Sequence, residues 1–483
     1  MSLALLAEGN VKQAIDLLVK SATQLCKEQP AVAMAVTGAV VYLSSLGSLL
    51  FMLSRPEPKR VTALVDPVGS ENSIKQLIAG TMAWISRQKE LRKSSKSSPK
   101  SLEAFHTPEN HAFFNESYYF NGCDLATKDR FITRISRRSY LGSRTYVFLL
   151  VDSKEHGLLQ LEEDCPAESK NANPTAMGLE YVCEIPMKRW RIKYHGPMRK
   201  GMYHPKDYAG KAEAEYVTVK LDLVFEVDSP LFWYMRDDHP TCLANNLSQE
   251  NWGRDFLGVC MKRTIDHAHY EDFGIAKGSI LIGSSTKSPQ YEFATFRDHS
   301  WDIRRWAAID KLKILLIALE EPLVFHGHEY WYLDVTLVDM PGNVAGVARY
   351  STGYMLGKVG TPRLVMKSGT SPLDIEYSTP SHKESYMEGV ERAPLPEETT
   401  VVRLTLHPKE FSDVGEEVVL KVKMTGQIRR LLYWPDHGAS KVYEDYQDMT
   451  VMDCKTGKTV VGYGTRQSGF RVGEFDASLG GCG

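Results

Sequence analysis

From about residue 105 onward, the chain is a succession of short runs in which apolar and polar residues alternate. Clear examples are Thr145–Val151 (TYVFLLV), Tyr216–Val227 (YVTVKLDLVFEV) and Tyr330–Val338 (YWYLDVTLV). β-Branched and aromatic residues at a period of two indicate strands, and the Gly, Pro, Asn and Asp residues between the runs indicate turns. Further runs of this kind are 279–282, 400–406, 418–424 and 459–462. This pattern predicts a mainly β fold and leaves little room for helices.

The length of this β region predicts two domains. About 380 residues of short strands exceed what one sandwich or barrel usually holds. Polar, Asn-rich sequence interrupts the strands near residues 240–265. We therefore expect the division between the two β domains to lie in that stretch.

One segment departs from the pattern of a soluble protein. Ala31–Leu53 contains no charged residue and is long enough to cross the hydrocarbon core of a bilayer as a helix. A buried core helix is the alternative; a signal peptide is disfavoured because 30 residues precede the apolar run. Arg55, Lys59 and Arg60 follow closely, and this basic flank predicts a cytosolic C-terminal body. The expected location is therefore a single-pass anchor in the endoplasmic reticulum or another endomembrane.

The segments around the apolar run have their own patterns. Residues 1–30 have apolar residues at helical spacing and predict an amphipathic helix. Within residues 54–104, a short helix is expected at 73–86, followed by a basic, Ser-rich linker at 87–101.

Charge and motifs exclude several function classes. The formal net charge is −2, which gives no reason to expect a nucleic-acid partner. The eight cysteines form no CxxC pair and no Cys/His cluster with zinc spacing. The chain also has no Gly-rich phosphate loop, no GxSxG elbow and no HExxH.

The densest group of chemically capable residues is the stretch 296–306 (FRDHSWDIRRW). It holds three arginines, two aspartates, one histidine and two tryptophans. Such groups are costly to bury unless they are paired or used, so this stretch is a candidate for chemistry or ligand binding. The alternative is an ion-pair network that fixes the end of a strand, with the tryptophans in the core.

Strand geometry groups four residues into two pairs. Residues two apart on a strand share a face, so His299 lies beside Trp301, and Tyr332 beside Asp334. If both strands line one cavity, a buried Asp334 would have a raised pKa and could donate a proton to a double bond or an epoxide. Trp301 and Tyr332 would stabilise the resulting cation. His299 would orient Asp334 or take a proton from the attacking water.

A weaker candidate is a metal site. His267, His269 and Glu271 alternate along one strand and could together bind a metal. Two histidines at i and i+2 are a weak signal, so no metal site is predicted.

The other weak candidate is the basic run 188–200. It could contact phosphate headgroups. It could equally be a solvated strand whose Trp190 and Tyr194 point inward.

Three short motifs resemble a known group. They are His269–Gly274 (HYEDFG), Gly278–Ile280 and Arg297–Trp301 (RDHSW). The region 105–483 resembles the AttH/carotenoid 1,2-hydratase-like group of bilobed lipocalin (calycin-like) proteins, and a domain of arthropod phosphoenolpyruvate-synthase-like proteins. The resemblance implies two tandem lipocalin-like antiparallel β-barrels, at 105–260 and 261–483. It also implies large apolar ligands and no cofactor.

The resemblance also implies a site. His299 with Trp301, and Tyr332 with Asp334, match the His-x-Trp and Tyr-x-Asp pairs of the hydratases, although Asp302 stands where that group usually has glycine. Ligand contacts are expected from Arg297, Asp298, His269, Trp190 and Tyr194.

The expected function follows from the anchor and the resemblance together. It is a membrane-anchored protein that binds an apolar isoprenoid or other lipid and acts on it by acid-catalysed hydration, cyclisation or isomerisation. The alternatives are a non-catalytic lipid carrier or chaperone, and a scaffold protein whose barrels are filled by side chains.

Overall fold

The computed structural model describes most of the chain from residue 73 onward. The described ranges are 73–106, 114–139, 144–166, 173–201, 215–248, 268–284, 289–303, 311–339, 349–367, 399–406, 417–433 and 440–471, with a few isolated residues between 24 and 47. The amphipathic helix predicted at 1–30 and nearly all of the membrane helix predicted at 31–53 lie outside these ranges. Within them, no helix combines the length and the apolar character that a membrane span requires.

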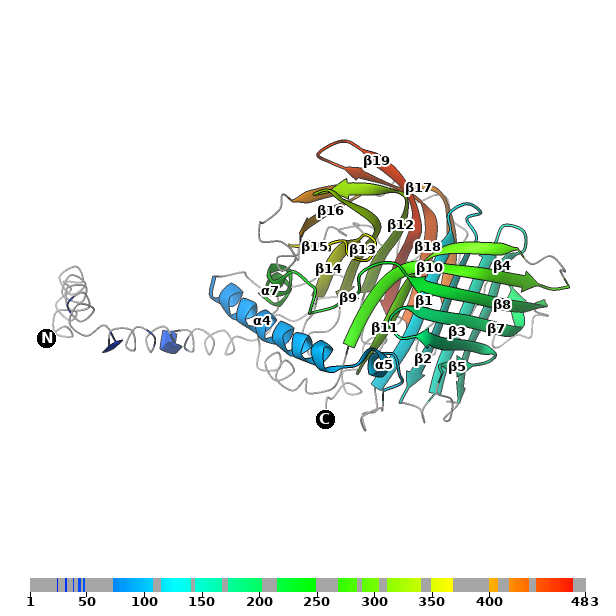
Figure 1. Ribbon diagram of the computed structural model, residues 1–483, viewed down its shortest axis with the longest axis horizontal. Coiled ribbons are helices and arrows are strands. Elements are labelled where there is room, and N and C mark those ends of the chain that lie inside the picture. Colours follow the sequence, from blue (N-terminus) through cyan, green and yellow to red (C-terminus); the bar gives the residue numbers. More distant parts are fainter. Residues whose placement is uncertain are drawn as a thin grey trace.

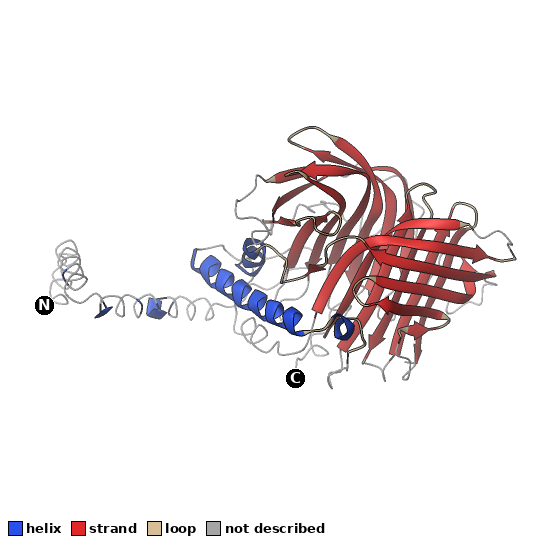
Figure 2. Cartoon of the chain, viewed as in Figure 1, coloured by secondary structure: helices blue, strands red, loops and turns tan. Residues whose placement is uncertain are grey.

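Strands dominate the described part of the chain (Figure 2). The helices are α4 (Ser73–Lys96), α5 (Pro99–Leu102) and α7 (Pro240–Ser248). The strands are β1 (Phe114–Asp124), β2 (Arg130–Arg138), β3 (Arg144–Ser153), β4 (Gly157–Pro166), β5 (Thr175–Ala176), β6 (Leu179–Ile185), β7 (Arg189–Lys200), β8 (Tyr216–Val227), β9 (Phe232–Trp233), β10 (Ala268–Ile282), β11 (Gln290–Ile303), β12 (Lys311–Phe325), β13 (His328–Asp339), β14 (Arg349–Leu356), β15 (Leu364–Met366), β16 (Thr399–Leu406), β17 (Val418–Tyr433), β18 (Ser440–Asp453) and β19 (Thr459–Arg471). Each strand run named from the sequence falls within one of these elements.

The strands form two units (Figure 1). β12 to β19 follow one another around a closed antiparallel barrel. The other unit is an 11-stranded sheet with the order β4-β3-β2-β1-β11-β10-β8-β7-β6-β5, to which β9 adds by pairing with β10. This sheet curls until β4 also pairs with β7, at Leu159–Lys200 and Gln160–Arg199. We call it the curled sheet.

The change from one unit to the other lies between Ile303 and Lys311, whereas the sequence predicted a division at residues 260 and 261. The hairpin of β10 and β11 inserts between β8 and β1 and so belongs to the curled sheet. The polar stretch that suggested a boundary contains α7, a helix within the first unit's part of the chain. The polar composition near residues 240–265 therefore reflects a helix between strands and not a boundary between domains.

Apolar side chains form three main layers. One cluster fills the inside of the curled sheet, a second fills the inside of the barrel, and a third joins the two units. Period-two alternation separates these layers: on β7, Trp190, Ile192 and Tyr194 are buried inside the curled sheet while the basic residues between them are less buried. The basic run is thus a solvated strand with its aromatic residues inward.

Helix α4 extends ten residues beyond the predicted end at 86 and includes most of the predicted basic linker. It packs against α7, and its Arg87 Nε donates to the carbonyl of Arg236 at 2.9 Å. Glu90 Oε2 accepts from Trp233 Nε1 at 3.0 Å. These tertiary contacts keep a Ser- and Lys-rich segment helical where local composition favours a linker.

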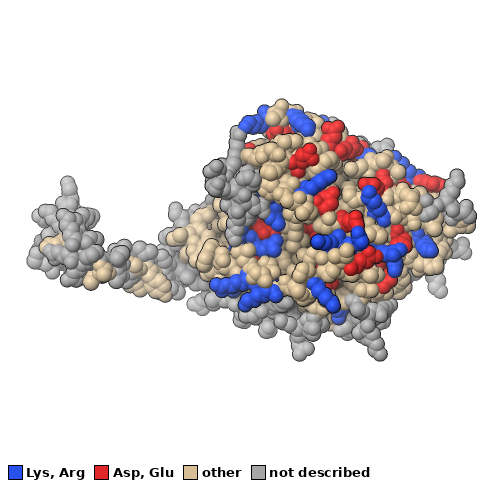
Figure 3. All heavy atoms as spheres, viewed as in Figure 1, with Lys and Arg blue, Asp and Glu red and all other residues tan. Residues whose placement is uncertain are grey.

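Positive and negative side chains are interspersed over the face shown in Figure 3. No single sign of charge dominates this face, in keeping with the small formal net charge of the whole chain.

Candidate functional site

The two predicted residue pairs lie on different faces. His299 and Trp301 share the face of β11 that looks into the curled sheet, and Tyr332 and Asp334 share the face of β13 between the two units, as period two requires. The expectation that all four line one cavity is not met. Asp298, the neighbour of His299 on the opposite face of β11, contributes to the raised pKa of Asp334, after the larger effects of burial and Glu271.

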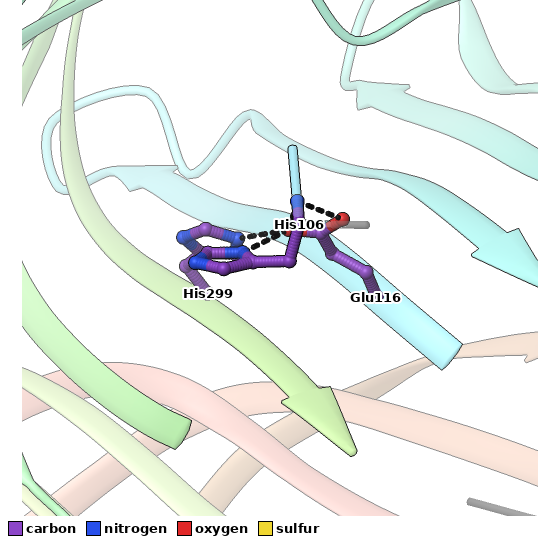
Figure 4. A group of neighbouring side chains, drawn as sticks. All are labelled: His106, Glu116 and His299. Carbon is purple, nitrogen blue, oxygen red and sulfur yellow. Dashed lines mark hydrogen bonds and ion pairs between the residues drawn. The ribbon is translucent and has the colours of Figure 1, made fainter. Parts of the chain in front are cut away.

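His299 is fully buried and interacts with residues of β10 and β1. Its Nδ1 lies 2.7 Å from the hydroxyl of Tyr270, and its Nε2 lies 3.3 Å from Oε1 of Glu116. The same carboxylate oxygen lies 2.8 Å from Nδ1 of His106 (Figure 4). Burial raises the pKa of Glu116, but hydrogen bonds from both histidines outweigh it and lower that pKa overall. We call His106, Glu116 and His299 the histidine cluster.

Trp301 packs beside the histidine cluster and away from Asp334. Its ring stacks on His106 with centroids 3.6 Å apart, and the ammonium of Lys93 lies 5.1 Å from its ring centroid. The indole is buried. Trp301 therefore shields His106 and cannot stabilise a cation formed at Asp334.

Asp334 is the centre of a second cluster, between the two units. Its Oδ1 accepts from Thr336 at 3.0 Å, and its Oδ2 has no hydrogen-bond partner among the described residues. The side chain is completely buried. Tyr354, its neighbour across the β13–β14 pair, donates its hydroxyl to Glu271 of β10, which brings Asp334 and Glu271 close to each other.

His269 joins this cluster to solvent. Its Nε2 forms ion pairs with Glu271 Oε1 at 3.0 Å and with Asp298, and its side chain is 29% exposed. Its ring stacks on Tyr234 at 4.0 Å, and Tyr234 donates to Glu271 Oε2 at 2.8 Å. We call Asp334, Glu271, His269 and Asp298, with Tyr234 and Tyr354, the acid cluster.

Aromatic rings surround the acid cluster. Tyr332 stacks on Phe273 at 4.5 Å, and Tyr354 stacks on Phe232 at 3.9 Å. All four rings belong to the apolar layer between the units. A buried acid therefore sits among ring faces, which is the combination that the sequence suggested, although with different partners.

The pKa values of Asp334, Glu271 and His269 in the acid cluster are all raised. Burial, reinforced by the charge of Glu271, raises the pKa of Asp334 well above its ordinary value. Burial also raises the pKa of Glu271. Burial alone would lower the pKa of His269, but Asp298 and Glu271 raise it to about 9. These shifts favour the protonated form of Asp334, and they make His269 an imidazolium at neutral pH.

The raised pKa of His269 predicts a pH-dependent contribution to stability. Its folded pKa of about 9 exceeds that of an unfolded histidine, so the contribution is complete below about pH 6.5 and is lost as pH rises through about 9. We expect the wild type to lose stability relative to His269→Gln over that window in urea unfolding. The exposed His195 provides the control variant His195→Gln. Parallel pH profiles for wild type and His269→Gln would contradict the assignment.

Three other residues predicted to contact a ligand, Arg297, Trp190 and Tyr194, are buried. Arg297 is fully buried and pairs with Asp272 and, at 2.7 Å, with Glu103. This agrees with the ion-pair alternative for the 296–306 stretch. Trp190 and Tyr194 are core residues of the curled sheet. His267, Arg304, Arg305 and Trp306 lie outside the described residues.

Sequence reasoning missed several members of both clusters. Period two did place Glu271 beside His269, but only as a weak metal-binding candidate and not as a neighbour of Asp334. Glu116, His106, Tyr234 and Tyr354 come from segments distant in sequence, and no local pattern marks them.

Comparison with known proteins gives one family match. The model described as "Domain of unknown function (DUF7064)" matches residues 100–367. No curated protein matched the chain.

Solved structures with a similar arrangement include three chains. The structure of a protein described as an AttH from Nitrosomonas europaea has a TM-score of 0.42 and 12% identity, over 76% of this chain and 98% of that one. CghA with Sch210972 has a TM-score of 0.40 and 8% identity, over 76% and 90%. CghA alone has a TM-score of 0.35 and 9% identity, over the same shares, 76% and 90%. The carotenoid-hydratase part of the sequence resemblance stays a prediction.

Proposed function

This chain belongs to the DUF7064 family, whose function is unknown, and we propose that it binds an apolar small molecule or lipid between its two β units and protonates it with Asp334. The observation that carries the proposal is the burial of Asp334: it is a fully buried acid whose Oδ2 lacks a hydrogen-bond partner among the described residues, and burial raises its pKa well above the ordinary value. Such a group is poised to donate.

The surroundings of Asp334 suit an unsaturated substrate. The Oδ2 proton would form a new C–H bond with the π electrons of a double bond, leaving a carbocation and the Asp334 carboxylate. The ring faces of Tyr332 and Phe273 would stabilise that cation. Water attack followed by return of a proton to Asp334 gives hydration; loss of a neighbouring proton to Asp334 gives isomerisation. In this proposal the acid cluster, and not His299, surrounds Asp334. Phe273, and not Trp301, joins Tyr332 in stabilising the cation.

Access to Asp334 is proposed to run past His269. Asp334 itself is inaccessible, but His269 is partly exposed and connects to it through Glu271. The imidazolium of His269 forms an ion pair with Asp298 and so neutralises the negative charge of Asp298 beside this entrance.

The membrane part of the proposal rests on sequence alone. An apolar span at residues 31–53 would hold the β units at an endomembrane, with the C-terminal body in the cytosol. The β units would then lie next to the membrane, in which an apolar ligand is concentrated.

A scaffold without a ligand is the second candidate, and one observation favours it. Inside the curled sheet, Phe120 contacts Tyr181, Trp190 and Phe225 at centroid distances of 5.1, 6.3 and 5.6 Å. Rings in mutual contact fill this interior, so a ligand would have to be accommodated between the units.

Asp334→Asn is the decisive variant. Incubation of the full chain with a membrane lipid extract, in water enriched in deuterium and heavy oxygen, should label a co-purifying lipid at carbon, and with oxygen if hydration occurs. Asn cannot donate a proton as Asp does, so we expect labelling to fall by about 10²–10⁴-fold. Mass spectrometry of the extracted lipids is the measurement.

The control for this variant is Asp222→Asn. Asp222 is partly exposed on β8 and pairs with Arg191, so its loss should leave labelling unchanged. Equal labelling by wild type and Asp334→Asn would refute acid catalysis. One unlabelled lipid bound by both would indicate a carrier, and no bound lipid would indicate the scaffold.

A further inference from the structure

The histidine cluster is separate from Asp334 and has no role in the proposed protonation. It lies on the inward face of the curled sheet, whereas Asp334 lies between the units. Its three side chains come from the segment before β1, from β1 and from β11. Two histidines, one of them far away in sequence, thus converge on one carboxylate oxygen of Glu116.

The hydrogen bonds of Tyr270 determine the tautomer of His299. The Tyr270 hydroxyl donates its single proton to the carbonyl of Leu102 at 2.8 Å. Its contact of 2.7 Å with His299 therefore has Nδ1–H as the donor and the Tyr270 oxygen as the acceptor. In the neutral imidazole, the lone pair is then on Nε2, and it faces Glu116 Oε1 at 3.3 Å.

A lone pair facing a carboxylate oxygen in a buried site is unfavourable unless something positive lies between them. Either a second proton on His299 or a bound cation would supply that charge. A cation accounts for more of the geometry, because Nδ1 of His106 also converges on the same region, 2.8 Å from Oε1 (Figure 4). Protons alone would require one on Nε2 of His299 and another on Nδ1 of His106, whereas a single cation accounts for both contacts.

We propose that His106 Nδ1, His299 Nε2 and Glu116 Oε1 bind a divalent first-row transition metal ion, of which zinc is the case to test. These three atoms all lie within 4.8 Å of one another. Ligands about 2.0–2.2 Å from zinc are separated by about 3–3.5 Å, close to the observed contacts. Two imidazoles favour zinc, iron or copper over magnesium or calcium.

The surroundings of the cluster are those of a metal site with an ordered outer shell. Tyr270 holds Nδ1 of His299 in the way that hydrogen-bond partners orient metal-binding histidines. The backbone N–H of His106 donates to Glu116 Oε2 at 3.1 Å and so orients the carboxylate. Trp301 covers the His106 ring, and His106, 18% exposed, is the route by which an ion would enter. Three protein ligands leave a position for water.

Zinc binding by the tag-free full chain tests this site. After loading with Zn²⁺ and desalting, we expect about one zinc per chain by elemental mass spectrometry, and a rise in Tm that EDTA reverses. His106→Ala and Glu116→Gln should each bind zinc at least about 100-fold more weakly in calorimetric titration. Tyr270→Phe retains all three ligands and should weaken binding by about 10–100-fold.

Two matched controls locate the ion. His195→Ala removes an exposed histidine and should leave zinc binding unchanged. His269→Ala removes the histidine of the acid cluster, whose His269, Glu271 and Asp298 could also hold an ion. Loss of zinc from His269→Ala with retention in His106→Ala would overturn the proposal. So would a wild type that retains no zinc, because His299 would then carry the second proton.

His106→Ala also keeps the proposal testable if Glu116→Gln fails to fold. His106 is partly exposed and precedes the first strand, so the metal-free variant should match the far-ultraviolet circular dichroism of the wild type. A folded His106→Ala that binds zinc like the wild type would also overturn the proposal.

Discussion

Arg297→Met is expected to destabilise the protein by about 3–5 kcal/mol, because it leaves two buried carboxylates without their cation. Asp272 accepts from both Nε and Nη2 of Arg297, and Glu103 accepts from Nη1 at 2.7 Å. All three side chains are 1–2% exposed. Burial alone would lower the pKa of Arg297, but Asp272 and Glu103 raise it well above its ordinary value. Urea unfolding of wild type and variant measures the difference.

The same sheet provides a matched control for Arg297. Arg189 pairs with Glu226, and these side chains are 42% and 58% exposed. Arg189→Met should therefore change stability by no more than about 1 kcal/mol. If both arginine variants lost the same free energy of unfolding, burial would add nothing to the contribution of Arg297. Its two carboxylates would then have found other partners.

Trp190→Ala is the second large expected effect, about 3–5 kcal/mol of lost stability. The indole is 0% exposed, and its ring contacts Tyr118 and Phe120 at centroid distances of 5.5 and 6.3 Å. Removing it leaves a large void that the tightly packed strands of the curled sheet cannot fill by moving inward. Thermal and urea unfolding would both report the loss.

Trp84 is the matched control for Trp190. Its side chain lies on α4 and is 60% exposed, so Trp84→Ala should alter stability by no more than about 0.5 kcal/mol. A small loss of stability in Trp190→Ala would mean that the Trp190 side chain leaves its buried position in solution, or that a ligand fills the void. That result would revive the sequence-based prediction of Trp190 as a binding residue.

Period-two alternation predicted the strands because each strand has one face in an apolar layer. It also fixed which residues share a face, as with Tyr332 and Asp334. It could not show which unit a strand joins: β11 pairs with β1, far away in sequence, and no local signal encodes that. The helical residues 87–96 were missed for a similar reason, since Trp233 and Arg236 hold them from a distance.

The candidate site, like the fold, was predictable from the sequence only in part. The sequence analysis expected a buried Asp334 with a raised pKa only if both strands lined one cavity; Asp334 is buried, and burial raises its pKa, but in a different setting. The choice of His299 as its partner was wrong, because β11 presents Asp298 and not His299 to the other unit. Tyr354 reaches the site from another strand. Its presence there depends on tertiary packing, which no spacing in the sequence encodes.

The insertion of the β10–β11 hairpin between β8 and β1 has a consequence for biosynthesis. Until residues 268–303 have left the ribosome, β1 and β8 each present an unpaired edge of backbone N–H and C=O groups. The curled sheet therefore cannot be completed before residue 303 has been translated. During this interval the first strand of the curled sheet lacks its partner β11, the last strand of the same sheet, and its exposed edge is open to pairing with other chains.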